Sequence, residues 1–375
     1  MELKKLKLSE NKCSKLHIGK KTTSCPKHLV HGSEMKTSEK EKYLGDIINS
    51  KASSKDTIDD RKTRGHAILS KMTAILSDIP LGKRRTEAGI ELRHAWFLNG
   101  CLFNSEVWSG FTEQDLHDLE VIDHQILRLI TGSHQKAPVE MLYLETAELL
   151  IKSVIIVRRL LYLQTILKRH KKELTSKVYF AMKEEPLKGD WIMKVKEDFL
   201  SLGTTFEQEE ETLTKISKEE LKRYLKEKIR SYTLEHLESM KLGHEKVRKI
   251  KHTDLNQPQA YIVSNKLSNK EKSLLFNLRS MCDNNFRDNF HNRYQTYQCQ
   301  FCTSTDSQEH ALSCNETTKY LDMEDTKILQ TIKYNDLFGT VEEQLPIVKI
   351  FAKLIKIRQK LRKQLSDTTQ GQAGH

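Results

Sequence analysis

The residues with the clearest chemical signature are three cysteines and a histidine near the C-terminal end. Two residues separate Cys299 from Cys302, seven separate Cys302 from His310, and three separate His310 from Cys314. Two thiolates at this spacing can grip one tetrahedral ion from a tight turn, while a histidine and a cysteine at i and i+4 complete the coordination from a helix. Four protein ligands leave no open position for water, so the pattern predicts a structural zinc site. The alternative is three unrelated thiols and a surface histidine.

Cationic and aromatic residues flank the first cysteines. Arg293, Tyr294, Tyr297 and Phe301 lie within a few residues of them. Aromatic faces stack on unpaired bases, and cations bind the phosphates between the bases. The sequence therefore favours single-stranded nucleic acid as a ligand here, with Arg293, Tyr297 and Phe301 as contacts.

A second group of possible metal ligands has a simpler explanation. Cys13, His17, Cys25, His28 and His31 satisfy a permissive zinc pattern. Cys13 and His17 lie in a strand-like piece, where alternation points neighbouring side chains to opposite faces. Ordinary packing explains them better than a metal does.

The tetrapeptide Thr57-Ile58-Asp59-Asp60 superficially matches the paired aspartates of polymerases. Polymerases need the two carboxylates on a tight β-hairpin, where they hold two metal ions about 4 Å apart. Here the pair leads into a basic run and a helix, and the helix dipole alone favours acidic residues in a first turn. We therefore expect no magnesium site and no catalytic residue in this chain.

Composition predicts a mainly helical protein with a polyanionic partner. The 375 residues include only 15 glycines and 6 prolines, so turns are few and elements long. Lysine and arginine number 63 against 51 acidic residues, a net charge of +12. This excess favours nucleic acid over an anionic membrane surface.

The cysteine count and the apolar runs exclude two other classes. Seven cysteines behind a charged N-terminus without an apolar leader argue against a secreted disulfide scaffold. The most apolar run, residues 153–163, contains two arginines and is too short to span a bilayer. We expect an intracellular protein, nuclear or cytoplasmic and not secreted.

The elements that must position these residues follow from periodicity, caps and breakers. Strand-like pieces cover residues 15–18 and 43–48, and helical spacing replaces them after residue 54. Helices are expected over residues 58–79, 84–104, 112–132, 138–167, from 191 onward, 217–240 and 347–365, followed by a disordered tail at 366–375. The expected fold class is mainly α, with a small β piece at the N-terminus and a small zinc-knuckle loop near the C-terminus.

Several segments resemble the C-terminal part of reverse transcriptases from non-LTR (LINE-type) retrotransposons. Leu8-Ser9-Glu10-Asn11-Lys12-Cys13, continued by residues 14–19, resembles the strand region after the polymerase Asp-Asp hairpin, and Tyr43-Leu44-Gly45-Asp46-Ile47-Ile48 resembles the primer grip. The helices over residues 56–132, with Leu102-Phe103-Asn104-Ser105-Glu106-Val107-Trp108 among them, resemble the thumb. Cys299, Cys302, His310 and Cys314 resemble the family's cysteine-histidine knuckle. The order of these motifs, rather than any one of them, is specific.

The resemblance implies a division into five parts. They are a palm remnant with a primer-grip-like hairpin at 1–55, thumb-like helices at 56–135, a helical connector at 136–282, the zinc knuckle of three cysteines and one histidine at 283–320, and a basic helix with a disordered tail at 321–375. The fingers, most of the palm and its metal-binding aspartates have no counterpart. The resemblance therefore implies a truncated fragment of an RNA-directed DNA polymerase that is not an enzyme on its own.

RNA or an RNA/DNA hybrid is the partner that the resemblance and the charge imply. Basic residues available for phosphate contacts are Lys83, Arg84 and Arg85 at the start of one helix, and Lys246, Arg248, Lys249 and Lys251 after another. Residues 56–136 hold ten basic and twelve acidic residues, so any binding surface there must be local. The alternative is a helical structural or interaction protein whose zinc loop only stabilises the fold, because interspersed lysine and glutamate are typical of solvated helices. The oligomeric state stays open.

Overall fold

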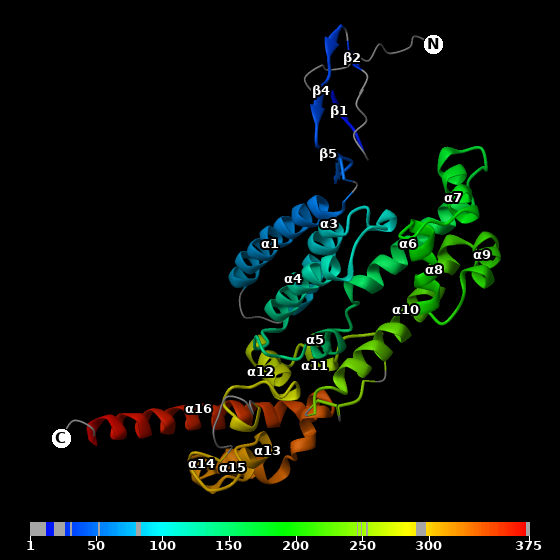
Figure 1. Ribbon diagram of the computed structural model, residues 1–375. Coiled ribbons are helices and arrows are strands. Elements are labelled where there is room, and N and C mark those ends of the chain that lie inside the picture. Colours follow the sequence, from blue (N-terminus) through cyan, green and yellow to red (C-terminus); the bar gives the residue numbers. More distant parts are fainter. Residues whose placement is uncertain are drawn as a thin grey trace. The chain divides into compact units, whose positions relative to one another are not determined.

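A computed structural model describes residues 13–18, 27–30, 32–51, 53–79, 84–245, 247–248, 250–252, 254–289 and 298–372. The protein is mainly helical with a small β piece at its N-terminus, which confirms the predicted fold class (Figure 1). It divides into two compact units, each assembled from separate segments. The first unit comprises residues 1–68, 95–122 and 151–225, and the second comprises residues 69–94, 123–150 and 226–375. The five-part division stays a prediction.

The β piece belongs to the first unit and consists of three strand pairs. The pairs are β1 (Ser14–Leu16) with β4 (Lys36–Ser38) in parallel, β2 (Leu29–Val30) with β3 (Ser33–Glu34) antiparallel, and β5 (Lys40–Tyr43) with β6 (Asp46–Asn49) antiparallel. Leu44 and Gly45 both have positive φ angles, 47° and 93°. Two such residues make a tight turn that suits a hairpin. Residues 43–48, expected to be one strand-like piece, therefore form a hairpin in which Tyr43 pairs with Asp46.

Helices make up most of the described chain. Those wholly in the first unit are α3 (Asn99–Cys101), α6 (Ile151–Leu167), α7 (Leu174–Glu184), α8 (Trp191–Ser201) and α9 (Phe206–Lys215). Those wholly in the second are α2 (Arg85–Leu92), α5 (Val139–Thr146), α11 (Ala260–Val263), α12 (Asn269–Arg279), α13 (Gln308–Ser313), α14 (Asn315–Thr318), α15 (Met323–Thr331) and α16 (Val341–Gln372). Three helices contain residues of both units: α1 (Lys55–Asp78), α4 (Glu113–Thr131) and α10 (Lys218–Lys241).

Local capping signals predicted helix starts correctly. The Thr112 hydroxyl accepts from the Asp115 backbone N–H, and the Asp115 carboxylate accepts in return from the Thr112 N–H at 2.9 Å, directly before α4. Ser217 and Glu220 make the same reciprocal pair before α10. Each pair satisfies exposed amides of a first helical turn, which is why the short-range signal is reliable.

Two predicted helices are interrupted. The helix expected over 84–104 changes to a π-helical turn at residues 93–98 and ends at Cys101. The helix expected over 138–167 breaks into α5 and α6 because Ala147 adopts a left-handed conformation, φ 54°. Both interruptions lie at one buried ion cluster: Arg93, the first residue of the π-helical turn, donates to both oxygens of Asp123 at 2.7 Å and to Glu148 in the break. A buried charge requires such partners, and no local pattern reveals them.

Two further expectations concern the chain near Asp60 and near the C-terminus. Asp59 and Asp60 lie in α1, as predicted, and Asp60 forms ion pairs with Lys42 at 2.9 Å and Arg64 at 3.0 Å.

The prediction of a disordered C-terminal tail is wrong for residues 366–372, which continue α16 to Gln372. Apolar positions of α16 further back in the chain are buried and support a long helix.

The core of the first unit surrounds α6, which contacts α7, α8 and α9. Two buried polar side chains of α6 bind other segments. Arg159 donates to Asp198 at 2.7 Å and to the Trp108 carbonyl at 3.1 Å, and Gln164 donates to the Leu213 carbonyl at 3.1 Å. Trp108 is buried and stacks on Phe111 with ring centroids 4.1 Å apart.

The core of the second unit includes α12 and α16, which contact each other. Its central polar feature is the Glu145 cluster, formed by Glu145, Arg279 and His252. Arg279 donates to both Glu145 oxygens at 2.9 Å, and His252 Nε2 lies 3.1 Å from one of them. All three side chains are buried. The cluster joins α5, α12 and the segment after α10.

None of the helices in the described part of the chain has the length and apolar character needed to cross a membrane.

Candidate metal centre and basic helix

The predicted cysteine-histidine site lies between a short turn and helix α13. The Cys299 N–H donates to the Ser304 carbonyl at 2.7 Å, which closes the turn that contains Cys302. Ser307 caps α13 by accepting from the His310 N–H at 3.0 Å, so His310 occupies the first helical turn. Cys314 directly follows the last residue of α13. Turn and cap together bring the four residues to one place.

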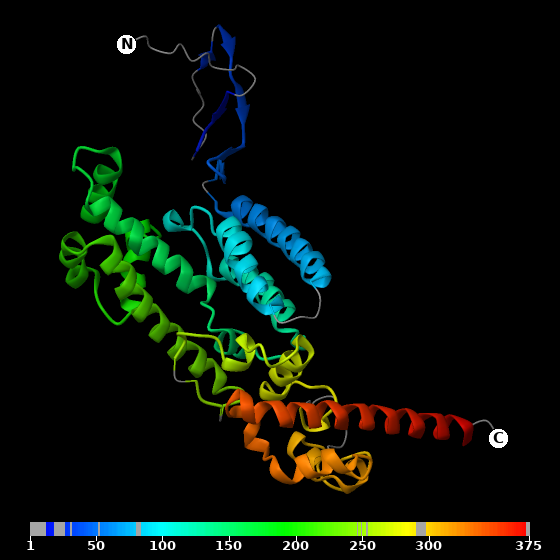
Figure 2. The same cartoon turned by 180° about the vertical axis from the view of Figure 1, so that it is seen from behind.

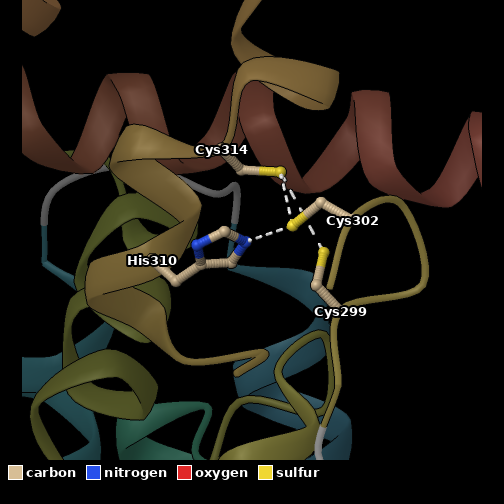
Figure 3. A group of neighbouring side chains, drawn as sticks. All are labelled: Cys299, Cys302, His310 and Cys314. Carbon is tan, nitrogen blue, oxygen red and sulfur yellow. Dashed lines mark hydrogen bonds between the residues drawn. The ribbon is translucent and has the colours of Figure 1, made fainter. Parts of the chain in front are cut away.

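All four predicted ligands converge (Figure 3). Their ligand atoms lie within 4.8 Å of one another. Cys314 Sγ is 4.0 Å from the sulfurs of both Cys299 and Cys302, and Cys302 Sγ is 3.2 Å from His310 Nε2. Zinc–sulfur and zinc–nitrogen bonds of about 2.3 and 2.0 Å in a tetrahedron place ligand atoms roughly 3.5–3.8 Å apart. The cluster therefore could bind a metal ion with small side-chain adjustments.

Three of the four groups have pKa values that their surroundings shift, in different directions. Burial raises the pKa of the Cys299 thiol to about 11. Burial also opposes ionisation of Cys302, but hydrogen bonds from the Ser304 backbone and the other thiols outweigh it and lower the pKa of Cys302. Burial, with the positive charge of Arg358, lowers the pKa of His310, which favours the neutral imidazole that metals bind. A metal would have to displace the Cys299 proton, so its binding would release protons.

The turn is attached to α16 by a buried arginine. Arg358 is fully buried, forms an ion pair with Asp306, and lies over the rings of Phe286 and Phe301 at 5.5 and 5.3 Å. Arg362 of α16 donates to Gln300 at 2.8 Å. Figure 1 and Figure 2 both show α14 and α15 beside α16, and these helices contact it. The cysteine-histidine cluster and α16 thus form one packed region within the second unit.

The other predicted contacts have varied positions. Lys83, Lys246, Lys249, Arg293 and Tyr297 lie outside the described residues, as do Cys25 and His31 of the second cysteine-histidine group. Arg84 is exposed directly before α2, while Arg85 is half-buried and lines a cavity. Arg248 and Lys251 are exposed, and Arg248 lies 3.9 Å from Glu245. Phe301 is half-buried beneath Arg358 and does not present an open ring for stacking on that side.

The structure shows a basic feature that was not chosen from the sequence as a contact site. Helix α16 carries exposed lysines at positions 349, 353, 356, 360 and 363, which we call the lysine row. At 100° per residue they fall within an arc of about 80°, opposite the buried Ile347, Phe351, Leu354 and Arg358. In the sequence, the spacing of these lysines, alternately four and three residues, was the signal that could have indicated a basic helix face.

Protein-family models show no match to the chain, and comparisons with curated proteins and with solved structures likewise find no similar chain. The resemblance to reverse transcriptases therefore stays a prediction from motif order.

Proposed function

We propose that the protein binds RNA or an RNA/DNA hybrid through the lysine row of α16, with the neighbouring turn stabilised by a structural zinc ion. One observation carries this proposal: five exposed lysines share one face of a helix whose opposite face is buried. Helix packing fixes their direction, so the charges act together rather than as scattered surface residues. The overall net charge of +12 and the predicted resemblance support the same partner.

The dimensions of the lysine row suit a phosphate backbone. From residue 349 to residue 363 a helix rises about 21 Å, at about 1.5 Å per residue, and this length faces several phosphates of a strand. No acidic residue occurs between residues 344 and 366. Lys353 lies close to Asp325, which pairs with it and partly neutralises the row at that point.

Lysines acting as point charges bind phosphate without reading the bases. We therefore expect affinity that depends strongly on salt and weakly on sequence. The proposed zinc has no catalytic part, because four protein ligands leave no open position on the ion. Its part is to hold the turn that presents Phe301 and Asp306 to Arg358 of α16.

A salt titration with a matched pair of variants tests the proposal. The first variant, K349Q/K356Q/K360Q, removes three charges from the lysine row. The control, K172Q/K177Q/K188Q, removes three exposed lysines from the first unit instead. Binding of a fluorescent single-stranded RNA and of an RNA/DNA hybrid is measured by anisotropy between low and physiological salt.

The wild-type protein should show a log–log salt slope of several units, because each neutralised phosphate contributes roughly 0.7–0.9. The lysine-row variant should lose about two units of slope, and the control should keep the slope of the wild type. Equal losses in both variants would mean that binding is diffuse and not located on α16. No binding at low salt would favour a structural or interaction role instead.

A further inference from the structure

The second unit contains a cavity of about 320 Å³ that the metal site and the lysine row do not use. It is lined by the start of α2, the end of α4, α11 and α12 from Asn269 to Asn277. One part of the lining is apolar and includes Ile130, Ile262 and Leu274. The other part is cationic and includes Arg85, Lys270 and Lys272. The cavity thus combines an apolar wall with several positive charges.

Lys272 is the unusual residue of this cavity. Its side chain is only 2% exposed, and within the described chain its ammonium has no hydrogen-bond partner. Lysines are almost never fully buried unless they are paired, because an unpaired charge loses its hydration without compensation. Burial accordingly lowers the pKa of Lys272. An ammonium in this position requires an anion or water from outside the chain.

Arg85 adds a second unsatisfied donor. Its Nε is buried and also has no partner among the residues that the structure describes. No acidic side chain is among the described residues that line the cavity. Glu87 attracts Lys272 electrostatically, but no salt bridge joins the two within the described part of the chain. The positive charge of the cavity is therefore not neutralised within it.

Neighbouring polar side chains are engaged elsewhere. The Ser273 hydroxyl donates to the Gly132 carbonyl at 2.6 Å, which attaches α12 to the end of α4. The Asn277 carbonyl oxygen accepts from the His134 N–H at 2.8 Å. These bonds fix the walls of the cavity. They leave the donors of Lys272 and Arg85 to a ligand.

We propose that this cavity binds a phosphate group, with Lys272 and Arg85 as its principal ligands and Lys270 at its rim. A phosphate ester carries a charge of about −1.5 to −2 and three acceptor oxygens, which suit a cavity lined by two or three cationic side chains. The apolar wall would contact the organic part of a phosphorylated molecule. This site is separate from the lysine row, and its test does not depend on the proposed function.

Thermal unfolding with inorganic phosphate as the probe tests the site in the full-length protein. Phosphate should raise the Tm of the wild type by roughly 3–6 °C at about a hundred times its Kd, beyond the effect of chloride at equal ionic strength. Lys272→Met should raise the Tm in phosphate-free buffer, because methionine removes a buried unpaired charge, and should abolish the phosphate response. The matched control Lys327→Met, at an exposed position of α15, should keep it.

Arg85→Gln provides a second variant in case Lys272→Met alters folding, and it should weaken phosphate binding by about tenfold. A wild type without a phosphate-specific shift, or a Lys272→Met protein that keeps the shift, would overturn the proposal. Two further probes distinguish the source of the phosphate. If a mononucleotide binds the wild type but not Lys272→Met, the natural ligand is a small phosphorylated molecule. If instead an RNA strand binds Lys272→Met more weakly than the wild type, and inorganic phosphate displaces that RNA, the cavity binds a phosphate of the RNA backbone.

Discussion

The cysteine-histidine site and the Glu145 cluster connect the chain of the second unit in two different ways. The four possible metal ligands lie within 16 consecutive residues and are brought together by one turn and one capped helix. The Glu145 cluster instead joins residues 134 positions apart through charged hydrogen bonds. The first arrangement has the ligand set that a metal ion would complete, while in the second Arg279 and Glu145 pair directly within the protein.

This difference shows in which kind of local structure a metal site, and in which a buried ion pair, can hold segments of the chain together. The turn at residues 298–307 has little regular structure, with one isolated β-bridge between Gln298 and Thr305 in its described part. Such a segment would gain order from a bound metal, because the ion would replace a missing apolar core. Glu145 lies among buried helices where its charges are shielded from water, and there a satisfied ion pair specifies which elements meet.

Loss of a metal ligand should have the largest effect and should stay local. Cys302→Ser should abolish zinc binding, since three ligands cannot retain the ion comparably and structural sites contribute about 10–16 kcal/mol of apparent binding energy. Native mass spectrometry should show one zinc in the wild type and none in the variant. Hydrogen exchange should become faster at residues 298–314 and stay unchanged in α6 and α10.

Cys282→Ser is the control for that experiment. Cys282 is buried in the same unit but is not one of the four converging residues. It should keep the zinc. A Cys302→Ser protein that still carries the metal would show that the cluster is not the site.

Loss of the carboxylate in the Glu145 cluster should act on the whole second unit. Glu145→Gln leaves the buried Arg279 guanidinium without its ion-pair partner and should lower the free energy of unfolding by about 3–5 kcal/mol. The surface variant Glu342→Gln, which breaks an exposed pair with Lys266, should change it by less than about 0.5 kcal/mol. Urea unfolding measures both. Similar values for the two variants would remove the distinction between buried and exposed pairs.

Acid should weaken the Glu145 cluster in a defined window. Burial opposes ionisation, but the charge of Arg279 and hydrogen bonds from Arg279 and His252 lower the pKa of Glu145 to about 2, from a usual 4.5. A lowered folded-state pKa contributes stability above pH 4.5, and this contribution is lost as the pH falls toward 2. The difference in unfolding free energy between wild type and Glu145→Gln should therefore shrink by about 3 kcal/mol across this window. A constant difference would contradict the assigned shift.

Loss of a helix cap should have the smallest effect on stability, and this effect should be measured mainly as a change in zinc affinity. Ser307→Ala removes the acceptor for the His310 N–H and should cost about 1 kcal/mol of local order. Zinc affinity should fall by roughly fivefold as a result, measured by competition with a chelator. Ser307→Asp should restore it, because aspartate is also a good cap. Unchanged affinity in Ser307→Ala would mean that the ion orders α13 without help.

Sequence patterns succeeded wherever the deciding contacts are short-range. The caps at Thr112 and Ser217 and the four converging ligands each depend on residues within a turn or two, so spacing alone reveals them. The same patterns missed the break at Ala147 and the π-helical turn at residues 93–98. Those interruptions lie beside a buried arginine, Arg93, whose partners Asp123 and Glu148 are distant in the chain.

The amino-acid sequence by itself determined that this protein is mainly helical, basic, and equipped with a ligand set of three cysteines and one histidine, because composition, periodicity and ligand spacing are local properties. Only the tertiary structure decided that Glu145 meets Arg279 and that Lys272 lines a cavity with no hydrogen-bond partner among the described residues. Burial and charge pairing depend on which distant segments pack together. No short stretch of sequence contains that information.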